Sequence, residues 1–432
     1  MKRVGILGGG IAGLSLSYFL GAESEVLEKE SKTGGLCRSF QHEGFTFDLG
    51  GHIIFSKDQE ILDIELAVLK DRVEKFRRHA SVWFKGQFVK YPFENGMGVL
   101  DKEDRFEILY NFLENPPREV NNFEDWIYNT FGKGLADLYL MPYNRKIWKT
   151  EPREMGVKWV ERVPKPPTAD LVKSALGIET EGYTHQLYFW YPKEGGFETV
   201  PRTFEEHCAD RVVKNFAVRR VRRTPRGWAV SDGKDEREYG KIVCSMPIWD
   251  FIRALDDVPP EVVRAVDKLK YNSLFVVMVG LNRPRRQEQV ATFFPQPDII
   301  FHRLVWFDYC GKNYAPPGCS SMVVEITAKE NSDAWAMSEQ DVAARVVEDL
   351  AREGFLQKGE VIATAVQRVK YAYPVYDLLR ESNLEVLNAW CREQGIELCG
   401  RFAEFNYLNS DAVIRSAKNC SERINSEAKQ HA

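Results

Sequence analysis

The sequence has no pair of cysteines at the close spacing that zinc ribbons and redox dithiols use. Its eight cysteines are scattered over 432 residues without a C-x-x-C motif. No H-x₃-H or comparable ligand spacing occurs, so we expect no metal site. No apolar run reaches the roughly 18 uninterrupted residues of a membrane-spanning helix. These absences predict a protein of the reducing cytoplasm without a membrane span.

An excess of charge of one sign is also lacking. The 59 Lys and Arg residues nearly balance 63 Asp and Glu residues, giving a net charge of -4. A net charge this close to zero does not favour nucleic acid or an anionic membrane as a partner. An anionic ligand would therefore need a local group of cationic or N–H donors. With 44% hydrophobic residues the chain can bury a large core, and its length predicts two or three subdomains.

The first thirty residues combine short apolar runs with a helical pattern. Residues 2–8 predict a buried strand, residues 10–21 a helix, and residues 24–29 a second strand. A strand, helix and strand in this order are typical of the start of a doubly wound α/β fold. We therefore expect a nucleotide-binding domain to begin at the start of this chain.

A glycine motif lies between the first expected strand and the helix. Gly8, Gly10 and Gly13 form G-x-G-x-x-G, in which the first two glycines permit a tight turn close to a pyrophosphate and the third permits close helix packing. Glu28 follows Gly8 by 20 residues, at the end of the second strand. A carboxylate there can accept hydrogen bonds from a ribose hydroxyl. The pattern predicts a dinucleotide site.

Two further glycine-containing segments indicate which dinucleotide binds. Residues 33–39 contain Gly35 and Arg38, and residues 47–52 contain Gly51 and His52. Together with the first motif, these segments resemble the amine-oxidase superfamily of FAD enzymes, which includes protoporphyrinogen oxidases and UDP-galactopyranose mutases. The resemblance implies an FAD cofactor, a strand over residues 212–218 on the adenine side with Val218 as a contact, and His52 beside the isoalloxazine ring.

Later segments resemble UDP-galactopyranose mutases in particular. They are residues 91–95, 141–148, 189–196, 301–303, 373–374 and 400–409. The resemblance implies that Arg303, Tyr373 and Tyr407 hold a nucleotide-sugar diphosphate, with His52 among the catalytic residues. It implies flavin contacts from Arg401, Asn409 and Asp411, the last two at the start of a helix whose dipole can stabilise a reduced flavin. It also implies a substrate pocket lined by Tyr91, Asn144, Trp148 and Trp190.

Two positions depart from the mutase pattern. Trp190 stands where mutases have a substrate-binding Arg, and Phe293 stands where they have a Tyr. A Trp offers one N–H donor and cannot neutralise a phosphate charge, so a different activated sugar or a less charged substrate is expected.

Two enzymatic functions therefore remain, beside a flavin-binding protein that has lost its catalytic role. The first is an FAD-dependent nucleotide-sugar mutase, in which the resemblance implies that reduced flavin N5 attacks the anomeric carbon. The alternative is an FAD-dependent oxidoreductase of the amine oxidase or protoporphyrinogen oxidase type. Either enzyme would act on a small molecule. The mutase would also need an external reductant, such as NAD(P)H, to reduce its flavin.

The expected fold class is α/β: an FAD-binding Rossmann-like (GR2-type) flavoprotein of two lobes, with a helical insertion and a mixed-sheet substrate domain. The expected FAD-binding parts are residues 1–100, 191–250 and 371–432, the last including a C-terminal tail. The helical insertion is expected at residues 101–190 and the mixed-sheet domain at residues 251–370.

Overall fold

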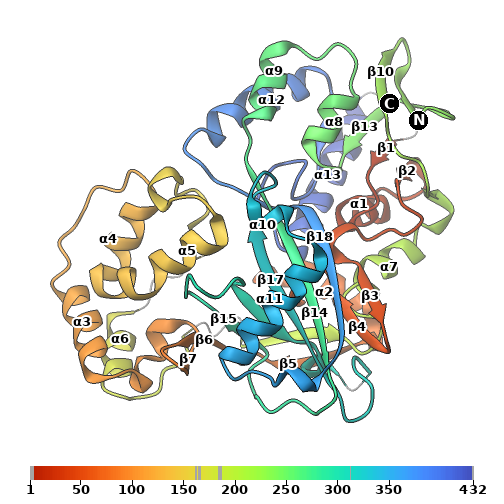
Figure 1. Ribbon diagram of the computed structural model, residues 1–432. Helices are drawn as coiled ribbons and strands as arrows, with labels where there is room; N and C mark the ends of the chain where they lie inside the picture. Colours follow the sequence, from red (N-terminus) through yellow and green to blue (C-terminus); the bar gives the residue numbers. More distant parts are fainter. Residues whose placement is uncertain (1–3, 161–162, 164–166, 183–186, 312, 431–432) are drawn as a thin grey trace.

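A parallel five-stranded sheet forms one centre of the protein. The computed structural model describes residues 4–160, 163, 167–182, 187–311 and 313–430 (Figure 1). The sheet is assembled from segments far apart in the chain, in the order β19-β13-β1-β2-β9. Its strands are β1 (Val4–Leu7), β2 (Ser24–Leu27), β9 (Val212–Val213), β13 (Lys241–Cys244) and β19 (Glu397–Leu398). The expected strand, helix and strand at the N-terminus are confirmed.

Helices cover this sheet and carry its hydrophobic contacts. α1 (Ile11–Leu20) packs against α13 (Ser410–Gln430) and α7 (Thr199–Glu206), and α2 (Gln59–Leu69) packs against α7 and α13. Figure 1 shows α1 and α13 side by side near both chain ends. A second core lies under three further helices, α8 (Ile248–Ala254), α9 (Pro260–Asp267) and α12 (Arg380–Glu393).

A seven-stranded mixed sheet forms the second centre. Its order is β18-β14-β17-β16-β15-β6-β7, antiparallel except for the parallel pair β15 and β6. The strands are β6 (Ala80–Phe84), β7 (Gln87–Lys90), β14 (Tyr271–Leu281), β15 (Ala291–Phe293), β16 (Arg303–Trp306), β17 (Ser320–Ala328) and β18 (Val361–Pro374). All nine residues of β17 are buried. α11 (Glu339–Arg352), capped by Ser338, buries Val342, Val346 and Leu350 against the sheet, and the short α10 (Asp333–Ala336) precedes it.

The helical part lies to one side of the mixed sheet, on the left of Figure 1. It contains α3 (Lys102–Leu113), α4 (Phe123–Leu135), α5 (Met141–Trp148) and α6 (Thr168–Ala175). α4 is followed by one π-helical turn, Ala136–Leu140, that leads into α5.

Three small sheets complete the fold. β3 (Ser39–His42) pairs with β4 (Phe45–Asp48), and β5 (Val73–Arg77) pairs with β8 (Tyr188–Pro192). β10 (Arg220–Thr224), β11 (Gly227–Ser231) and β12 (Glu236–Tyr239) form an antiparallel sheet of their own. The prediction of one strand over residues 212–218 is wrong, because pairing with β2 extends only over Val212–Val213.

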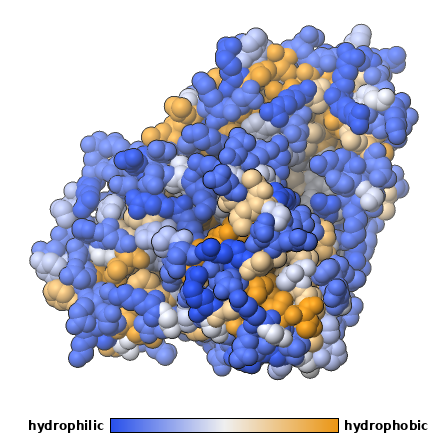
Figure 2. All heavy atoms as spheres, viewed as in Figure 1, coloured by the Kyte–Doolittle hydropathy of each residue, from blue (hydrophilic) through white to orange (hydrophobic). Residues whose placement is uncertain are grey.

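The mixed α/β class is confirmed, while the domain boundaries stay a prediction. Residues 80–90, placed before the boundary at 100, pair within the mixed sheet. Hydrophilic side chains cover most of the face in Figure 2, with apolar atoms showing over α9 and α12. Among the described residues, no helix combines the length and apolar character needed to cross a bilayer. In the same residues, no cluster of His, Cys, Asp or Glu is arranged to hold a metal.

Candidate flavin and substrate site

The turn between β1 and α1 has the geometry of a pyrophosphate cradle. Gly8 has a φ of 121°, which favours glycine, and a Cβ on Gly13 would collide with the Gly8 carbonyl oxygen. A Cβ on Gly10 would meet no protein atom within 4 Å. The first and third glycines are therefore required by the turn itself. Gly10 instead leaves room for a ligand to approach the backbone.

Glu28 is fixed at the end of β2, beside this turn. Its Oε2 accepts a hydrogen bond from Gly9 N at 2.8 Å, and its Oε1 accepts one from Glu30 N at 2.9 Å. Each carboxylate oxygen can accept a second hydrogen bond, so the oriented group can still bind ribose hydroxyls. Phe216 N donates to the Glu28 carbonyl at 2.8 Å. The segment after β9 thus lies beside Glu28, while Val218 is partly buried and outside any strand.

The second glycine segment closes against the first. Gly34 N donates to Gly9 O at 2.8 Å, and a Cβ on Gly35 would lie 3.3 Å from Gly10 Cα. Arg38 Nε donates to Gly35 O at 3.1 Å and so braces the loop that contains both residues. This loop provides bare backbone and a cation next to the cradle, and the roles of Gly35 and Arg38 toward the cofactor stay a prediction.

The loop before α13 reaches the same place from the other end of the chain. Gly400 has a φ of 96°, and a Cβ there would lie 2.6 Å from Ala12 Cβ on α1. The hydrogen bonds of the Arg401 side chain go to backbone carbonyls: Nε and Nη2 donate to Leu408 O at 2.8 and 2.6 Å, and Nη1 donates to Ala372 O at 3.2 Å. The side chain therefore fixes the turn that leads into α13.

The start of α13 is anchored on the loop before α2. Val413 N donates to Asn409 O at 2.9 Å, so Asn409 immediately precedes the helix. Asp411 Oδ2 accepts a hydrogen bond from Ser56 Oγ at 2.6 Å. The predicted helix start at these residues is present, although Asp411 is held by the protein itself.

His52 is a neutral imidazole in this setting. Its ring stacks on Phe197 with centroids 5.0 Å apart, and its Nδ1 has no partner among the described residues. Burial, and next the Arg401 guanidinium, lower the pKa of His52 to about 4. An unpaired ring nitrogen beside the glycine segment fits a contact to a bound molecule.

Arg303 is paired with a carboxylate that the sequence reasoning missed. Its Nη2 donates to Glu325 Oε1 at 2.5 Å, and Gly51 N donates to the same oxygen at 2.8 Å. Tyr373 OH donates to Glu325 Oε2 at 3.2 Å, and His302 Nε2 lies 3.5 Å from that oxygen. A lone Glu inside an otherwise uncharged strand, S-S-M-V-V-E-I-T-A, was the available signal.

The pair is strongly charged despite its burial. Glu325 is 0% exposed and the Arg303 side chain 26% exposed. Burial alone would raise the pKa of Glu325, but Arg303 and His302 outweigh it and hold the pKa well below the ordinary carboxyl range. Burial raises the pKa of Tyr373 far above its usual value, and Glu325 adds to this, so the hydroxyl stays a donor.

An aromatic group surrounds this pair. The Tyr407 ring stands edge-on to Trp148 at 5.7 Å and to Tyr373 at 5.8 Å, with the Arg401 guanidinium 5.1 Å from its centroid. Trp148 is only 3% exposed and donates through Nε1 to Asn144 Oδ1 at 3.2 Å. The structure thus joins Tyr373, Tyr407, Trp148 and Asn144, and it uses Trp148 largely for packing.

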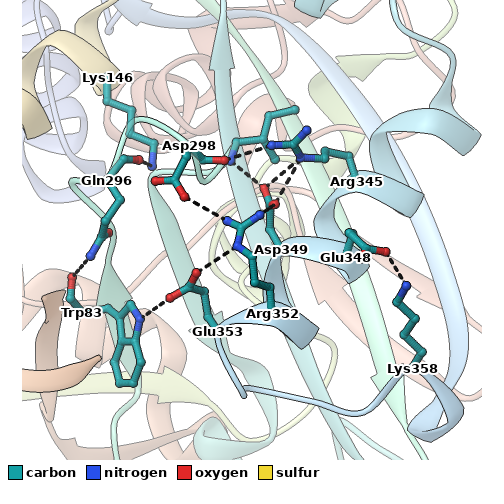
Figure 3. Close-up of polar contacts among 11 residues, drawn as sticks. Trp83, Lys146, Gln296, Asp298, Arg345, Glu348, Asp349, Arg352, Glu353 and Lys358 are labelled. Atoms are coloured by element: carbon teal, nitrogen blue, oxygen red, sulfur yellow. Dashed lines mark hydrogen bonds and ion pairs between the residues drawn. The ribbon is translucent and has the colours of Figure 1, made fainter. Parts of the chain in front are cut away.

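A second group of aromatic side chains surrounds Phe293 on β15, the strand that pairs with the strand of Arg303. Phe293, opposite Arg303 in the β15–β16 pair, packs on Tyr91 at 4.8 Å and on Tyr143 at 5.8 Å. The segment after Phe293 is held by Lys146, whose buried Nζ donates to Phe294 O at 2.9 Å and Gln296 O at 2.7 Å. Figure 3 shows this contact continuing through Gln296 to Trp83 and Glu353.

A polar network on α11 fixes the rest of that segment. Asp349 Oδ2 accepts from Ile300 N at 2.8 Å, while Arg345 and Arg352 bind Asp349 and reach Asp298 (Figure 3). The loop that carries Phe293 is therefore tied both to the helical part and to α11.

Trp190 is not joined to Arg303 by any contact of the described residues. Its backbone pairs with Ile54, and Lys75 Nζ lies 4.9 Å from its ring centroid on the β5–β8 sheet. The substrate role of Trp190 stays a prediction, as do those of the other site residues.

A cavity of about 540 Å³ opens beside Tyr91. Its walls include Arg77, Arg78 and Lys90, and Arg77 and Lys90 both pair with Glu181. The cavity therefore combines these partly balanced cations with apolar walls that include Phe88, Val99 and Ile178.

The glycine cradle, the oriented Glu28 and the converging α13 define a dinucleotide-binding enzyme of the two-lobe flavoprotein class. A family model described as flavin-containing amine oxidoreductase matches residues 11–424. The chain belongs to this family: it is a flavoenzyme, and its cofactor is FAD. Its cradle fits that cofactor, because the bare backbone at Gly10 and the braced Gly35 loop offer donors without steric obstruction.

Solved structures share this fold at low sequence identity. A reduced UDP-galactopyranose mutase has a TM-score of 0.90 and 23% identity, covering 99% of this chain and 96% of that one. Cyclohexylamine oxidase from Brevibacterium oxydans IH-35A has a TM-score of 0.70 and 14% identity, covering 99% of each chain. Among curated proteins, a lycopene-forming phytoene desaturase from Pseudescherichia vulneris is 26% identical over 149 residues, which are 33% of this chain and 29% of that relative's length.

Proposed function

We propose that this flavoenzyme acts on a nucleotide-linked sugar, in the manner of a UDP-galactopyranose mutase. The observation that carries the proposal is the placement of Arg303: its guanidinium is fixed by Glu325 on one side, while Nε has no partner among the described residues and the side chain is 26% exposed. A guanidinium oriented in this way presents a pre-organised edge to a phosphate oxygen.

The surrounding tyrosines suit the same task. Tyr373 and Tyr407 pack edge-to-face next to Arg303's carboxylate partner, so their positions are set before a substrate arrives. Orienting the diphosphate there would place the attached sugar in front of His52 and Gly51. The cavity beside Tyr91, with its mixed cationic and apolar walls, would take the part of the substrate farthest from the flavin. Bound reduced FAD would supply the nucleophilic flavin nitrogen, and bound oxidised FAD a hydride acceptor.

A second candidate, an FAD-dependent oxidoreductase for an amine or another weakly charged substrate, is favoured by one specific observation. Glu325 neutralises Arg303, and His52 is uncharged. Among the described contacts, none brings another cation to Arg303 at the position where Trp190 replaces an Arg. The Arg401 guanidinium acts on Tyr373 and His52, but with Arg303 offset by Glu325 the site cannot neutralise both charges of a diphosphate, which favours a less charged substrate.

Binding to the two redox states separates these functions. Holoprotein, oxidised and dithionite-reduced, is titrated with UDP-galactopyranose, UDP-glucose, putrescine and cyclohexylamine while the flavin absorbance is recorded. The mutase proposal expects saturable spectral changes with a nucleotide sugar on the reduced form, without net bleaching of the oxidised form. Bleaching by an amine, with no response to any nucleotide sugar, would establish the oxidoreductase instead.

A matched pair of variants locates the anion. Arg303→Ala is expected to weaken nucleotide-sugar binding by about 2–4 kcal/mol, because a phosphate loses a charge-assisted partner. The control variant is Arg220→Gln. Arg220 lies on the separate three-stranded sheet, and its exposed guanidinium pairs with Asp256, so its removal should leave nucleotide-sugar binding unchanged. Equal affinities in both variants would place the anion elsewhere.

Two further properties belong to the proposal. An external reductant such as NAD(P)H would keep the flavin reduced for a redox-neutral reaction. The enzyme would work in the cytoplasm, which the eight free cysteines support.

A further inference from the structure

Lys75 is a lysine whose ammonium group is held between two aromatic rings. It lies on β5, directly opposite Trp190 on β8. Its Nζ lies 4.9 Å from the ring centroid of Trp190 and 4.9 Å from that of Tyr188. Both distances are in the range of a cation–π contact. The two rings therefore fix the ammonium in place, although the lysine is exposed.

The charge of Lys75 is not offset by an acid. In the described part of the chain, Lys75 forms no ion pair, and its contacts are those with the two rings. Glu74, next to it in sequence, lies on the other face of β5, because side chains alternate along a strand. Lys75 thus keeps its positive charge available to a bound anion.

The strand pair that carries Lys75 borders the chain segment that reaches Arg303. Trp190 N donates to Ile54 O at 2.9 Å, and Ile54 N donates to Trp190 O at 3.0 Å. Three residues before Ile54, Gly51 N donates to the carboxylate that pairs with Arg303. Three residues of chain span at most about 11 Å. The cations of Lys75 and Arg303 therefore flank one short segment.

The same face of β5 also reaches the cavity beside Tyr91. Arg77 follows Lys75 by two residues, so both side chains lie on one face of the strand, and Arg77 lines the cavity. Tyr188 stands opposite Arg77 in the strand pair. This face thus presents two cations and two aromatic rings in a row that leads from the Ile54 segment towards the cavity.

We infer that Lys75 is a specificity-determining residue of this enzyme: its ammonium binds a phosphate group of the nucleotide-sugar substrate. The inference rests on the proposed function. Because Glu325 offsets Arg303, the residues around Arg303 leave one charge of a diphosphate without a cation. An ammonium is a compact charge on a flexible stem, so it can meet a phosphate oxygen from many directions. The same ammonium repels a cationic amine, so Lys75 favours the nucleotide sugar over an amine substrate.

The test measures the affinity of dithionite-reduced holoprotein for UDP by anaerobic calorimetric titration at low and high salt. Lys75→Met keeps the length of the side chain and removes its charge. It should bind UDP roughly tenfold more weakly at low salt and about twofold more weakly at high salt, because ions screen an exposed contact. The control is Lys193→Met, an exposed lysine just beyond the end of β8, which should match the native protein at both salt concentrations.

Moving the charge to the opposite strand separates binding from packing. Lys75→Met/Trp190→Arg places a cation at the same register position of the β5–β8 pair and should recover most of the lost affinity. A double variant that binds UDP no more tightly than Lys75→Met would overturn the inference, because the lysine would then act through packing. If the double variant fails to fold, Lys75→Arg, which keeps the charge, replaces it with the same expectation.

The outcomes also distinguish this inference from the proposed function. Native affinity for UDP in Lys75→Met at low salt, together with weakened binding in Arg303→Ala, would overturn the inference and leave the proposed function intact. A native holoprotein that binds no UDP in either redox state would overturn both.

Discussion

Arg303 and Glu325 lie directly opposite each other on the antiparallel strands β16 and β17, with Arg303 Nη2 2.5 Å from Glu325 Oε1. The carboxylate is fully buried and also accepts from Gly51 N, so it links the mixed sheet to the glycine segment at the flavin site. This one contact orients the cation proposed to bind substrate and offsets its charge. The proposed function therefore also depends on Glu325, a residue that belongs to none of the sequence motifs.

Removing Arg303 should destabilise the fold. Arg303→Ala is expected to lower the free energy of unfolding by about 2–4 kcal/mol, because it leaves the buried Glu325 without its cation. The double variant Arg303→Ala/Glu325→Gln should recover part of that loss. Denaturant titrations at pH 7 measure both quantities, and an equally large loss in the double variant would show that the pair is not the cause.

Blocking Gly10 should abolish FAD binding without harming the fold. A Cβ at Gly10 would meet no protein atom within 4 Å, and its φ of −73° suits any residue, so Gly10→Leu should fold normally. Its side chain would occupy the approach to the pyrophosphate, and the purified protein should be colourless. Gly359→Leu, at another open position, should stay yellow. Full flavin absorbance in Gly10→Leu would refute the placement of the cradle.

Arg401→Ala should lower the flavin content by loosening the turn before α13. The variant removes three donors to Leu408 O and Ala372 O, which costs about 1 kcal/mol or more per buried unsatisfied acceptor. The ratio of flavin to protein absorbance checks this result. Any remaining holoprotein should bind nucleotide sugar normally. A variant with full flavin but lost substrate binding would instead make Arg401 a substrate ligand.

His52 should make the protein less stable in mild acid. Its folded-state pKa of about 4 lies below the ordinary value of 6.5, so the unfolded chain binds more protons between these values. The free energy of unfolding should therefore fall as the pH drops from 6.5 towards 4. His52→Phe, which keeps the stacking on Phe197, should remove that part of the decline. Unfolding curves at pH 7, 5.5 and 4.5 provide the comparison.

Lys146 should make the stability of the fold depend on pH in the alkaline range. Burial, and next Lys149, lower the pKa of Lys146 from 10.5 to about 7, so the unfolded chain binds more protons between these values. The free energy of unfolding should rise from pH 7 towards pH 10 through this group, and the rise should be absent in Lys146→Met. An exposed control, Lys234→Met, should behave as the native protein. An unchanged slope in Lys146→Met would contradict the lowered pKa of Lys146.

The cofactor could be predicted from the sequence because its cradle is local. The requirements at Gly8, Gly10 and Gly13 concern the backbone of contiguous residues, and Glu28 reaches them through one strand and one helix of ordinary length. The spacing of these residues along the chain was therefore enough to predict how they are arranged around the turn. Val218 shows the limit of this reasoning, since the extent of β9 depends on how far β2 offers it partners.

The sequence by itself thus determined the α/β class, the FAD cradle and the family. Only the tertiary structure decided that Arg303 is held by Glu325 and that the Trp190 ring lies against Lys75, with no contact to Arg303 in the described part of the chain. The physical reason is that the charge a site presents depends on which side chains become neighbours. Strand register and helix packing between segments far apart in the chain set those neighbours, and no local spacing records them.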